Sequence, residues 1–321
     1  SRQICGSACY AVEEISPMIK LLFNFLIFPG FLFTAVFGLM ASWIDRKVTA
    51  RVQWRAGPPW YQPLMDLVKL SIKEITVPIS ASKELFFLSP MIGLSAVTLV
   101  STFVWLINID PGSKGFSGDV IVILYLLTLP AIAVILGASA SGNPLASLGV
   151  SREIKLVMAY ELPFIISLLV PIIKSGGMLR LGDIIAYQAA HGAFLSSLSG
   201  IIAFIVMIFC MQAKLGLVPF DMAEAETEIM AGTYIEYSGM LLAIFKLTKT
   251  MLMVALPLFL ITLFWQGFNF LSLWKYVVLL VIIILMRNTN PRVRIDQAVR
   301  FFWGKMTLMA ILAVLLAVKG F

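Results

Sequence analysis

The chain has 321 residues, of which 60% are apolar and 13% charged, and its mean hydropathy is +0.97. A soluble domain carries about 25% charged and about 45–50% apolar residues, so these values exclude a soluble enzyme. At about 20 residues per crossing, the chain is long enough for about seven to nine membrane helices. The net charge of +7 would indicate nucleic acid as the partner of a soluble protein. In a membrane protein it indicates basic loops on the cytoplasmic side, and no nucleic-acid partner is expected.

Eight charge-poor runs predict the membrane crossings, because every backbone polar group in lipid must be bonded within the protein. The runs cover approximately residues 21–44, 85–109, 120–140, 156–173, 192–213, 237–265, 268–286 and 304–318. The first run ends in charged residues and not in a small-residue cleavage site, so we expect an anchor and not a signal peptide. The prediction is one all-α integral membrane domain over residues 1–321.

Lysine and arginine positions predict the orientation. The loops 45–84, 141–155, 214–236 and 287–305 lie on one side of an eight-helix arrangement and hold 15 of the 24 basic residues. Positive charge accumulates in cytoplasmic loops. We therefore expect a multi-pass protein of the cell membrane, with both termini outside and the long charged loops in the cytoplasm.

The sequence indicates no cofactor or metal site in this chain. Its three cysteines form no CxxC pair, and the single histidine, His191, leaves little for haem or His-based metal binding. Cys5 and Cys9 have a CxxxC spacing that could place two ligands on one helical turn, but no further ligands accompany them.

The first charged loop, residues 45–78, predicts an amphipathic helix that lies on the membrane surface. Between residues 63 and 74, Leu64, Leu67, Val68 and Ile72 form an apolar stripe opposite charged residues, as in helices that lie in the interface plane. The charged residues of this loop are candidates for a docking surface: Arg46, Arg51, Arg55, Asp66, Lys69, Lys73 and Glu74.

Glu161 lies about one turn into an otherwise apolar run. A carboxylate there is costly unless it is protonated, paired or facing water. Pro163 lacks an N–H and frees the carbonyl of Ala159, which loosens the helix at this point. Glu161 is therefore either a proton relay or a structural ion pair with Lys155 or Arg152.

The acidic segment 221–236 has no basic residue nearby, between 215 and 245. Helical spacing would put Glu224 and Glu228 on one face with Asp221 one turn earlier, and crowded, partly desolvated carboxylates raise each other's pKa. The segment is either a proton relay or an acidic surface helix paired with the basic loops. Its carboxylates are Asp221, Glu224, Glu226, Glu228 and Glu236.

Two further groups of charges each leave two interpretations open. Lys246 and Lys249 lie at i and i+3 in the sixth run. They either extend to the interface or serve as counter-charges to the glutamates in a proton relay. The basic residues of the run 287–305 either anchor the neighbouring helix ends on the cytoplasmic side of the membrane, or form a docking surface. The docked partner would be peripheral subunits or anionic lipid. The candidate docking residues of this run are Arg287, Arg292, Arg294 and Asp296.

Four segments together resemble the family of respiratory complex I that contains mitochondrial subunit 1 and the bacterial H subunit. They are the Gly-Pro-Pro…Gln-Pro stretch at 57–63, Ala-Tyr-Glu-Leu-Pro at 159–163, Pro-Phe-Asp at 219–221 with the glutamates that follow, and Arg287 with the segment 291–297. Their order and spacing match across nearly the whole chain. The resemblance extends to the membrane-anchor subunit of the archaeal-type, membrane-bound energy-converting (group 4) NiFe-hydrogenases.

The resemblance implies the heel subunit of an L-shaped complex, which docks the electron-transferring arm onto the membrane arm. It implies that the buried carboxylates begin an ion path. It also implies three kinds of partner: an iron–sulfur small subunit, a NiFe-hydrogenase-like large subunit and antiporter-like membrane subunits. The iron–sulfur clusters and the NiFe centre would lie in those partners, and membrane lipid would surround the chain.

Departures from the complex I pattern favour the hydrogenase branch. Lys214 and Leu217 stand where complex I members usually have glutamate and arginine. The prediction is a subunit that couples H2 evolution to proton or sodium translocation without a quinone. The alternatives are the equivalent subunit of a membrane-bound sulfur reductase or of NADH-quinone oxidoreductase, and more distantly a stand-alone cation transporter.

Overall fold

The computed structural model describes residues 18–112, 115–266 and 272–320, and within these ranges it contains helices and loops but no strand. Seven helices are long and apolar enough to cross a membrane: Met18–Val52, Lys83–Ile109, Asp119–Ala140, Pro144–Lys174, Gly239–Phe264, Ser272–Thr289 and Ile295–Val318. The shorter apolar helix Leu198–Lys214 is the eighth. The all-α membrane fold is confirmed.

The elements follow one another in the order α2 (Phe31–Val52), α3 (Gln62–Ile72), α4 (Lys83–Ile109), α5 (Asp119–Ala140), α6 (Pro144–Lys174), α7 (Leu181–His191), α8 (Leu198–Lys214), α9 (Glu226–Ile229), α10 (Gly239–Phe264), α11 (Ser272–Thr289), α12 (Ile295–Arg300) and α13 (Thr307–Val318). Short 3-10 turns, η1 (Phe194–Ser196) and η2 (Gly232–Tyr234), precede α8 and α10. A π-helical turn, η3 (Phe301–Met306), joins α12 to α13.

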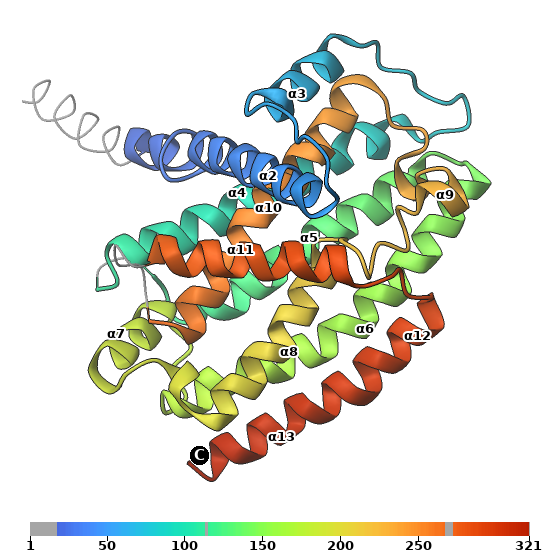
Figure 1. Cartoon of the computed structure of the whole chain (residues 1–321). Helices are drawn as coiled ribbons and strands as arrows, with labels where there is room; N and C mark the ends of the chain where they lie inside the picture. Colours follow the sequence, from blue (N-terminus) through green and yellow to red (C-terminus); the bar gives the residue numbers. More distant parts are fainter. Residues whose placement is uncertain (1–17, 113–114, 267–271, 321) are drawn as a thin grey trace, which may run out of the picture.

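Helix α10 occupies the centre of the bundle. It packs against α2, α4, α11 and α8, and its residues from 251 to 264 are all buried. A helix that is apolar all round is stable only when neighbours cover it on every side. Helices α3, α9 and α12 gather at one end of the bundle, whereas α7 and the C-terminus lie at the other (Figure 1).

Helix α2 approaches α10 closely at Gly38. A Cβ atom on Gly38 would lie 2.7 Å from the carbonyl oxygen of Thr250 in α10. Small residues allow such backbone approach in membrane bundles. The helix also continues to Val52, eight residues beyond its expected end, because the Asp45 carboxylate does not stop it but pairs with Arg287 of α11.

Three other helix boundaries differ from the sequence prediction. Helix α6 begins at Pro144, and not near 156, because the Asn143 side chain accepts a hydrogen bond from Leu145 N (2.8 Å) and proline is favoured at the first helical position. Helix α8 begins at Leu198, after Ser197 caps it by accepting from Gly200 N. The last crossing begins at Ile295, not 304, since the π-turn continues α12 into α13.

Helix α3 is amphipathic as predicted, and it lies against α2 and α10 at the end of the bundle. Its apolar residues Leu64, Val68 and Ile72 are exposed in the isolated chain. An exposed apolar stripe beside a charged one fits a helix that lies in the membrane interface.

Candidate functional site

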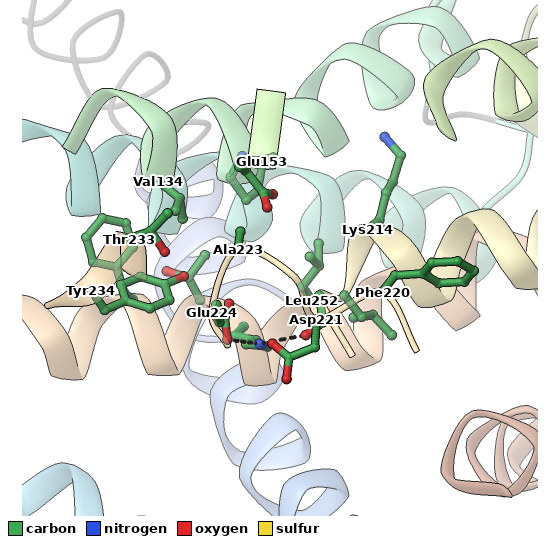
Figure 2. Close-up of a pocket in the computed structure, with 17 residues that line it drawn as sticks. Val134, Glu153, Lys214, Phe220, Asp221, Ala223, Glu224, Thr233, Tyr234 and Leu252 are labelled. Atoms are coloured by element: carbon green, nitrogen blue, oxygen red, sulfur yellow. Dashed lines mark hydrogen bonds and ion pairs between the residues drawn. The ribbon is translucent and has the colours of Figure 1, made fainter. Parts of the chain in front are cut away.

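The segment between α8 and α10 folds over the ends of several helices and encloses a small cavity. The cavity has about 50 Å³ of space, which is enough for a few water molecules. Helices α6, α8 and α10 and the 215–238 segment all contribute to its wall (Figure 2). Its ionisable lining residues are Glu153, Lys214, Asp221, Glu224, Tyr234 and Lys249.

Glu161 is paired with Lys214, and not with Lys155 or Arg152. Lys214 Nζ lies 3.0 Å from Glu161 Oε2, and the lysine side chain is only 1% exposed. The ammonium also lies 4.6 Å from the centre of the Phe164 ring, as a cation–π contact. Lys214, which the sequence marked only as a departure from complex I, is therefore the counter-charge of Glu161, whose side chain is 19% exposed.

Lys249 of α10 is the counter-charge of Glu224. Its Nζ lies 2.6 Å from Glu224 Oε2 and donates a second bond to the Gly216 carbonyl at 3.2 Å. Gly216 has a φ of +56°, a left-handed conformation that favours glycine. Lys246 is exposed and faces a second cavity of about 390 Å³, together with Arg287 of α11. Of the two lysines, Lys249 alone pairs with an acidic residue within the described part of the chain.

The acidic segment is tied to two neighbouring elements. Arg292 Nη2, in the α11–α12 link, lies 2.9 Å from Asp221 Oδ2. Arg152 of α6 lies 2.7 Å from Glu228, whose side chain is 58% exposed. Burial and the nearby Glu224 carboxylate raise the pKa of Asp221, against the opposing effect of Lys249 and Arg292.

The prediction that Asp221, Glu224 and Glu228 share one helical face is wrong. The backbone from 221 to 225 is not helical, and α9 covers only Glu226–Ile229. Left-handed residues at Met230 and Ala231 end the helix, and the carboxylates turn to different basic partners. Glu236 lies apart from them and accepts a hydrogen bond from Asn143. The side chain of Glu226 is outside the described part of the chain.

The sequence analysis did not identify Glu153 as a candidate, because this residue falls within the expected loop 141–155. Since α6 begins at Pro144, Glu153 is a helical residue two turns before Glu161. Figure 2 shows Glu153 pointing from α6 toward Glu224 and Asp221, and among the described residues it has no ion-pair partner. The Asn143-Pro144 dipeptide is the signal that would have placed the helix start correctly.

Tyr234 was also missed, and it lies beside Glu224 and Glu153. Burial and these two carboxylates hold the pKa of the Tyr234 hydroxyl well above its usual range, so the phenol remains protonated. A neutral hydroxyl can donate a hydrogen bond to a carboxylate and accept one from water. Tyr234 therefore adds a polar group without charge to the cavity.

The candidate docking residues form a charged end of the bundle and no closed site. Arg46 and Asp66 pair at 2.7 Å, with Gln62 donating to the other Asp66 oxygen at 2.9 Å. Arg287 pairs with Asp45. The remaining candidates are exposed: Arg51, Arg55, Lys69, Lys73, Glu74, Arg294 and Asp296.

Within the described residues, no cluster of three or more His, Cys, Asp or Glu side chains could hold a metal ion. Cys210 is buried, and Cys5 and Cys9 lie outside the described residues.

Fold and site together define a multi-pass membrane protein with ion pairs beneath a charged end. Residues 24–318 match the protein family described as NADH dehydrogenase, and the chain belongs to this family. It is 32% identical to the NADH-quinone oxidoreductase H subunit of Dehalococcoides mccartyi (strain CBDB1), over 89% of this chain and 82% of that protein. It is also 32% identical to the same subunit of Geobacillus sp. (strain WCH70), over 92% and 90% of the two chains.

The fold is similar to a chain in the solved structure of the membrane-bound sulfane sulfur reductase, an archaeal respiratory membrane complex. The TM-score is 0.82 at 28% identity, covering 92% of this chain and 99% of that one. The family resemblance seen in the sequence is confirmed. The chain is a membrane subunit of a complex I-like oxidoreductase complex, equivalent to the H subunit of its bacterial relatives.

Proposed function

We propose that the chain couples a redox reaction in partner subunits to ion translocation, through the carboxylates and lysines around the small cavity. The observation that carries this proposal is that Glu153, Lys214, Glu224 and Lys249 line a space that can hold water, while Glu161 pairs with one of them, Lys214. If these ion pairs only stabilised the protein surface, they would not need to be grouped around a cavity that can hold water. Ionisable groups inside membrane helices are costly, and such groups usually mark ion pathways.

The mechanism follows from how the acidic segment is held. The Asp221–Arg292 and Glu228–Arg152 pairs connect this segment to the α11–α12 link and to α6. A partner that docks on the charged end and changes its redox state shifts these pairs by electrostatics. Movement of Glu224 away from Lys249 then leaves the lysine free to interact with Glu153, and a proton or sodium ion moves to compensate.

For the chemistry of the complex, we propose the hydrogenase branch, with H2 evolution as the redox reaction. Lys214 stands at the position where complex I members usually have a glutamate, and its ammonium is paired with Glu161. The partners would be an iron–sulfur small subunit, a NiFe-hydrogenase-like large subunit and antiporter-like membrane subunits, which would hold the iron–sulfur clusters and the NiFe centre. The likeness to the sulfane sulfur reductase chain favours sulfur reduction as the second candidate.

The proposed setting is the cell membrane, with the charged end of α3, α9 and α12 in the cytoplasm and both termini outside. The positive charge of the loops at that end supports this orientation. The cavity would then open toward the docked partners.

Two measurements test the function and the branch. The complex is purified in mild detergent, where a coupling subunit remains with several other chains and a stand-alone transporter forms a homo-oligomer. Reduced methyl viologen then serves as donor, and H2, sulfide from polysulfide and reduced quinone are assayed in parallel. We expect H2 alone. Sulfide would assign the sulfur reductase, and quinol would assign NADH-quinone oxidoreductase.

Ion coupling is tested in inverted vesicles with Glu224→Gln and with the double variant Lys214→Met/Glu161→Gln, which leaves no buried ammonium without its partner. We expect both variants to assemble and to keep the redox reaction, but to lose ion uptake. Glu84→Gln is the matched control, because Glu84 is an exposed glutamate at the start of α4 and away from the cavity. Unimpaired ion uptake in both cavity variants would overturn the coupling proposal.

A further inference from the structure

We propose that a groove between the α11–α12 link, the end of α8 and the π-turn η3 binds an anionic phospholipid. The groove has a volume of about 410 Å³, and of its lining residues only Phe220 also lines the small cavity. It does not depend on the proposed redox chemistry. Two basic residues would hold the lipid phosphate, and aromatic and proline side chains would contact its glycerol and upper acyl carbons.

The walls of the groove belong to the folded core and are not chain ends. Val293 N, in the α11–α12 link, donates to Pro219 O at 3.1 Å and closes one side. The Phe209 and Phe301 rings pack edge to face at 5.4 Å and form the apolar floor. A site built in this way is preformed, which reduces the ordering cost of binding an amphiphile.

The charge of the groove is entirely positive. Among its described lining residues, Arg300 and Lys305 are basic and none is acidic. Both basic side chains are exposed, and within the described part of the chain neither has an ion-pair partner. The other polar lining residues, Asn290 and Gln297, are neutral, and the rest are apolar. Such a basic pair in a mostly apolar setting is complementary to an anionic headgroup.

The π-turn explains why two residues five apart can act on one ligand. In an α-helix, positions five apart differ by about 140° around the axis. The i→i+5 bonds of a π-turn bring positions five apart nearly in line along the helix. Residues Phe301–Met306 form such a turn, so Arg300 and Lys305 lie on one side.

The surroundings place the groove at the boundary between hydrocarbon and water. It lies at the beginning of the last membrane-spanning helix, Ile295–Val318. Along that helix Leu308, Leu312 and Leu315 are exposed by 67%, 50% and 60%, which gives acyl chains an apolar path. Trp303, also exposed, is of the residue type enriched at this boundary. An amphiphile with a negative head therefore fits better than a soluble anion.

The test uses the intact complex, delipidated and then titrated with phosphatidylglycerol or phosphatidylcholine in native mass spectrometry. The variant is Arg300→Gln/Lys305→Gln. The control is Lys20→Gln/Lys83→Gln, which removes two exposed basic residues outside the groove. We expect the groove variant to bind its tightest phosphatidylglycerol about 30-fold more weakly, as two lost contacts with an anionic lipid predict. The control should behave like the wild type, and phosphatidylcholine should show no difference.

A benzophenone amino acid at position 301 distinguishes a lipid from a protein occupant. Irradiation of the complex in phosphatidylglycerol vesicles should give a lipid adduct on this chain. A cross-link to another subunit would make the groove a protein interface and overturn the proposal. Equal phosphatidylglycerol affinity of the groove variant and the control would overturn it as well.

Discussion

Replacement of Lys214 by methionine tests how strongly the buried pair stabilises the site. The substitution leaves the Glu161 carboxylate beside apolar side chains, without the ammonium 3.0 Å away. At that distance the attraction of two unit charges is about 5.5 kcal/mol with an effective dielectric constant of 20. Removal of one partner from a buried pair costs about 3–5 kcal/mol, because the other charge remains buried. We expect Lys214→Met to destabilise the protein by about this amount.

The assay is the thermal unfolding midpoint of the purified complex. Arg152→Met is the matched control, because it breaks an ion pair of similar length whose acidic partner, Glu228, is 58% exposed. Exposed pairs contribute about 0–1 kcal/mol, so the control should lower the midpoint far less. The double variant Lys214→Met/Glu161→Gln should recover most of the loss, since it removes both charges and leaves no buried ion.

Two results would refute this reasoning. If Lys214→Met lowers the midpoint no more than Arg152→Met, the pair is solvated and does not stabilise the site. If the double variant is as unstable as the sum of its single variants, Lys214 and Glu161 are not energetically coupled. Either result would also weaken the proposal that this pair is part of an ion path.

Two further predictions concern the same end of the bundle. Partial burial acts to raise the pKa of Asp66, but the hydrogen bond and charge of Arg46 hold it below the ordinary 3.8. The pair therefore stabilises the fold above pH 3.8 and loses its effect as the pH falls through the lowered pKa; melting curves of wild type and Asp66→Asn should differ at pH 6 and converge in acid. Gly38→Ala should lower the free energy of unfolding by about 1–3 kcal/mol through overpacking, since the new Cβ atom would lie 2.7 Å from Thr250 O. Gly304→Ala is the control, because its Cβ would have no atom within 4 Å, and it should leave the melting midpoint unchanged.

The membrane helices could be predicted from the sequence because the bilayer imposes a length and an apolar composition on each crossing. The helix ends could not. Hydropathy reports only the part of a helix within the hydrocarbon, and α6 extends twelve residues beyond the expected start at 156. Arg152, Glu153 and Lys155 lie in that extension. Their charge marks the edge of the apolar run, whereas the helix start is determined by the Asn143 cap.

The candidate site was recognisable because carboxylates are rare in an apolar chain, but its pairing was not. Lys214 and Glu161 are 53 positions apart, and Lys249 and Glu224 are 25 apart. Which cation meets which carboxylate depends on how α6, α8 and α10 pack, and the intervals in one sequence do not encode that packing. Local spacing also predicted a helix through 221–228, but residues 221–225 are not helical, and Asp221, Glu224 and Glu228 each pair with a different basic residue.

The pairing gives the cavity residues different roles in the proposed relay. Lys214 is paired with Glu161, Lys249 with Glu224, and Asp221 with Arg292. A proton placed on any of these three carboxylates weakens an ion pair and leaves its cation uncompensated, which is costly away from water. Glu153 lines the same cavity and has no ion-pair partner among the described residues. If the chain relays ions as proposed, Glu153 can accept a proton or a cation without such a cost, and it would be the position from which charge passes to the Glu224–Lys249 pair.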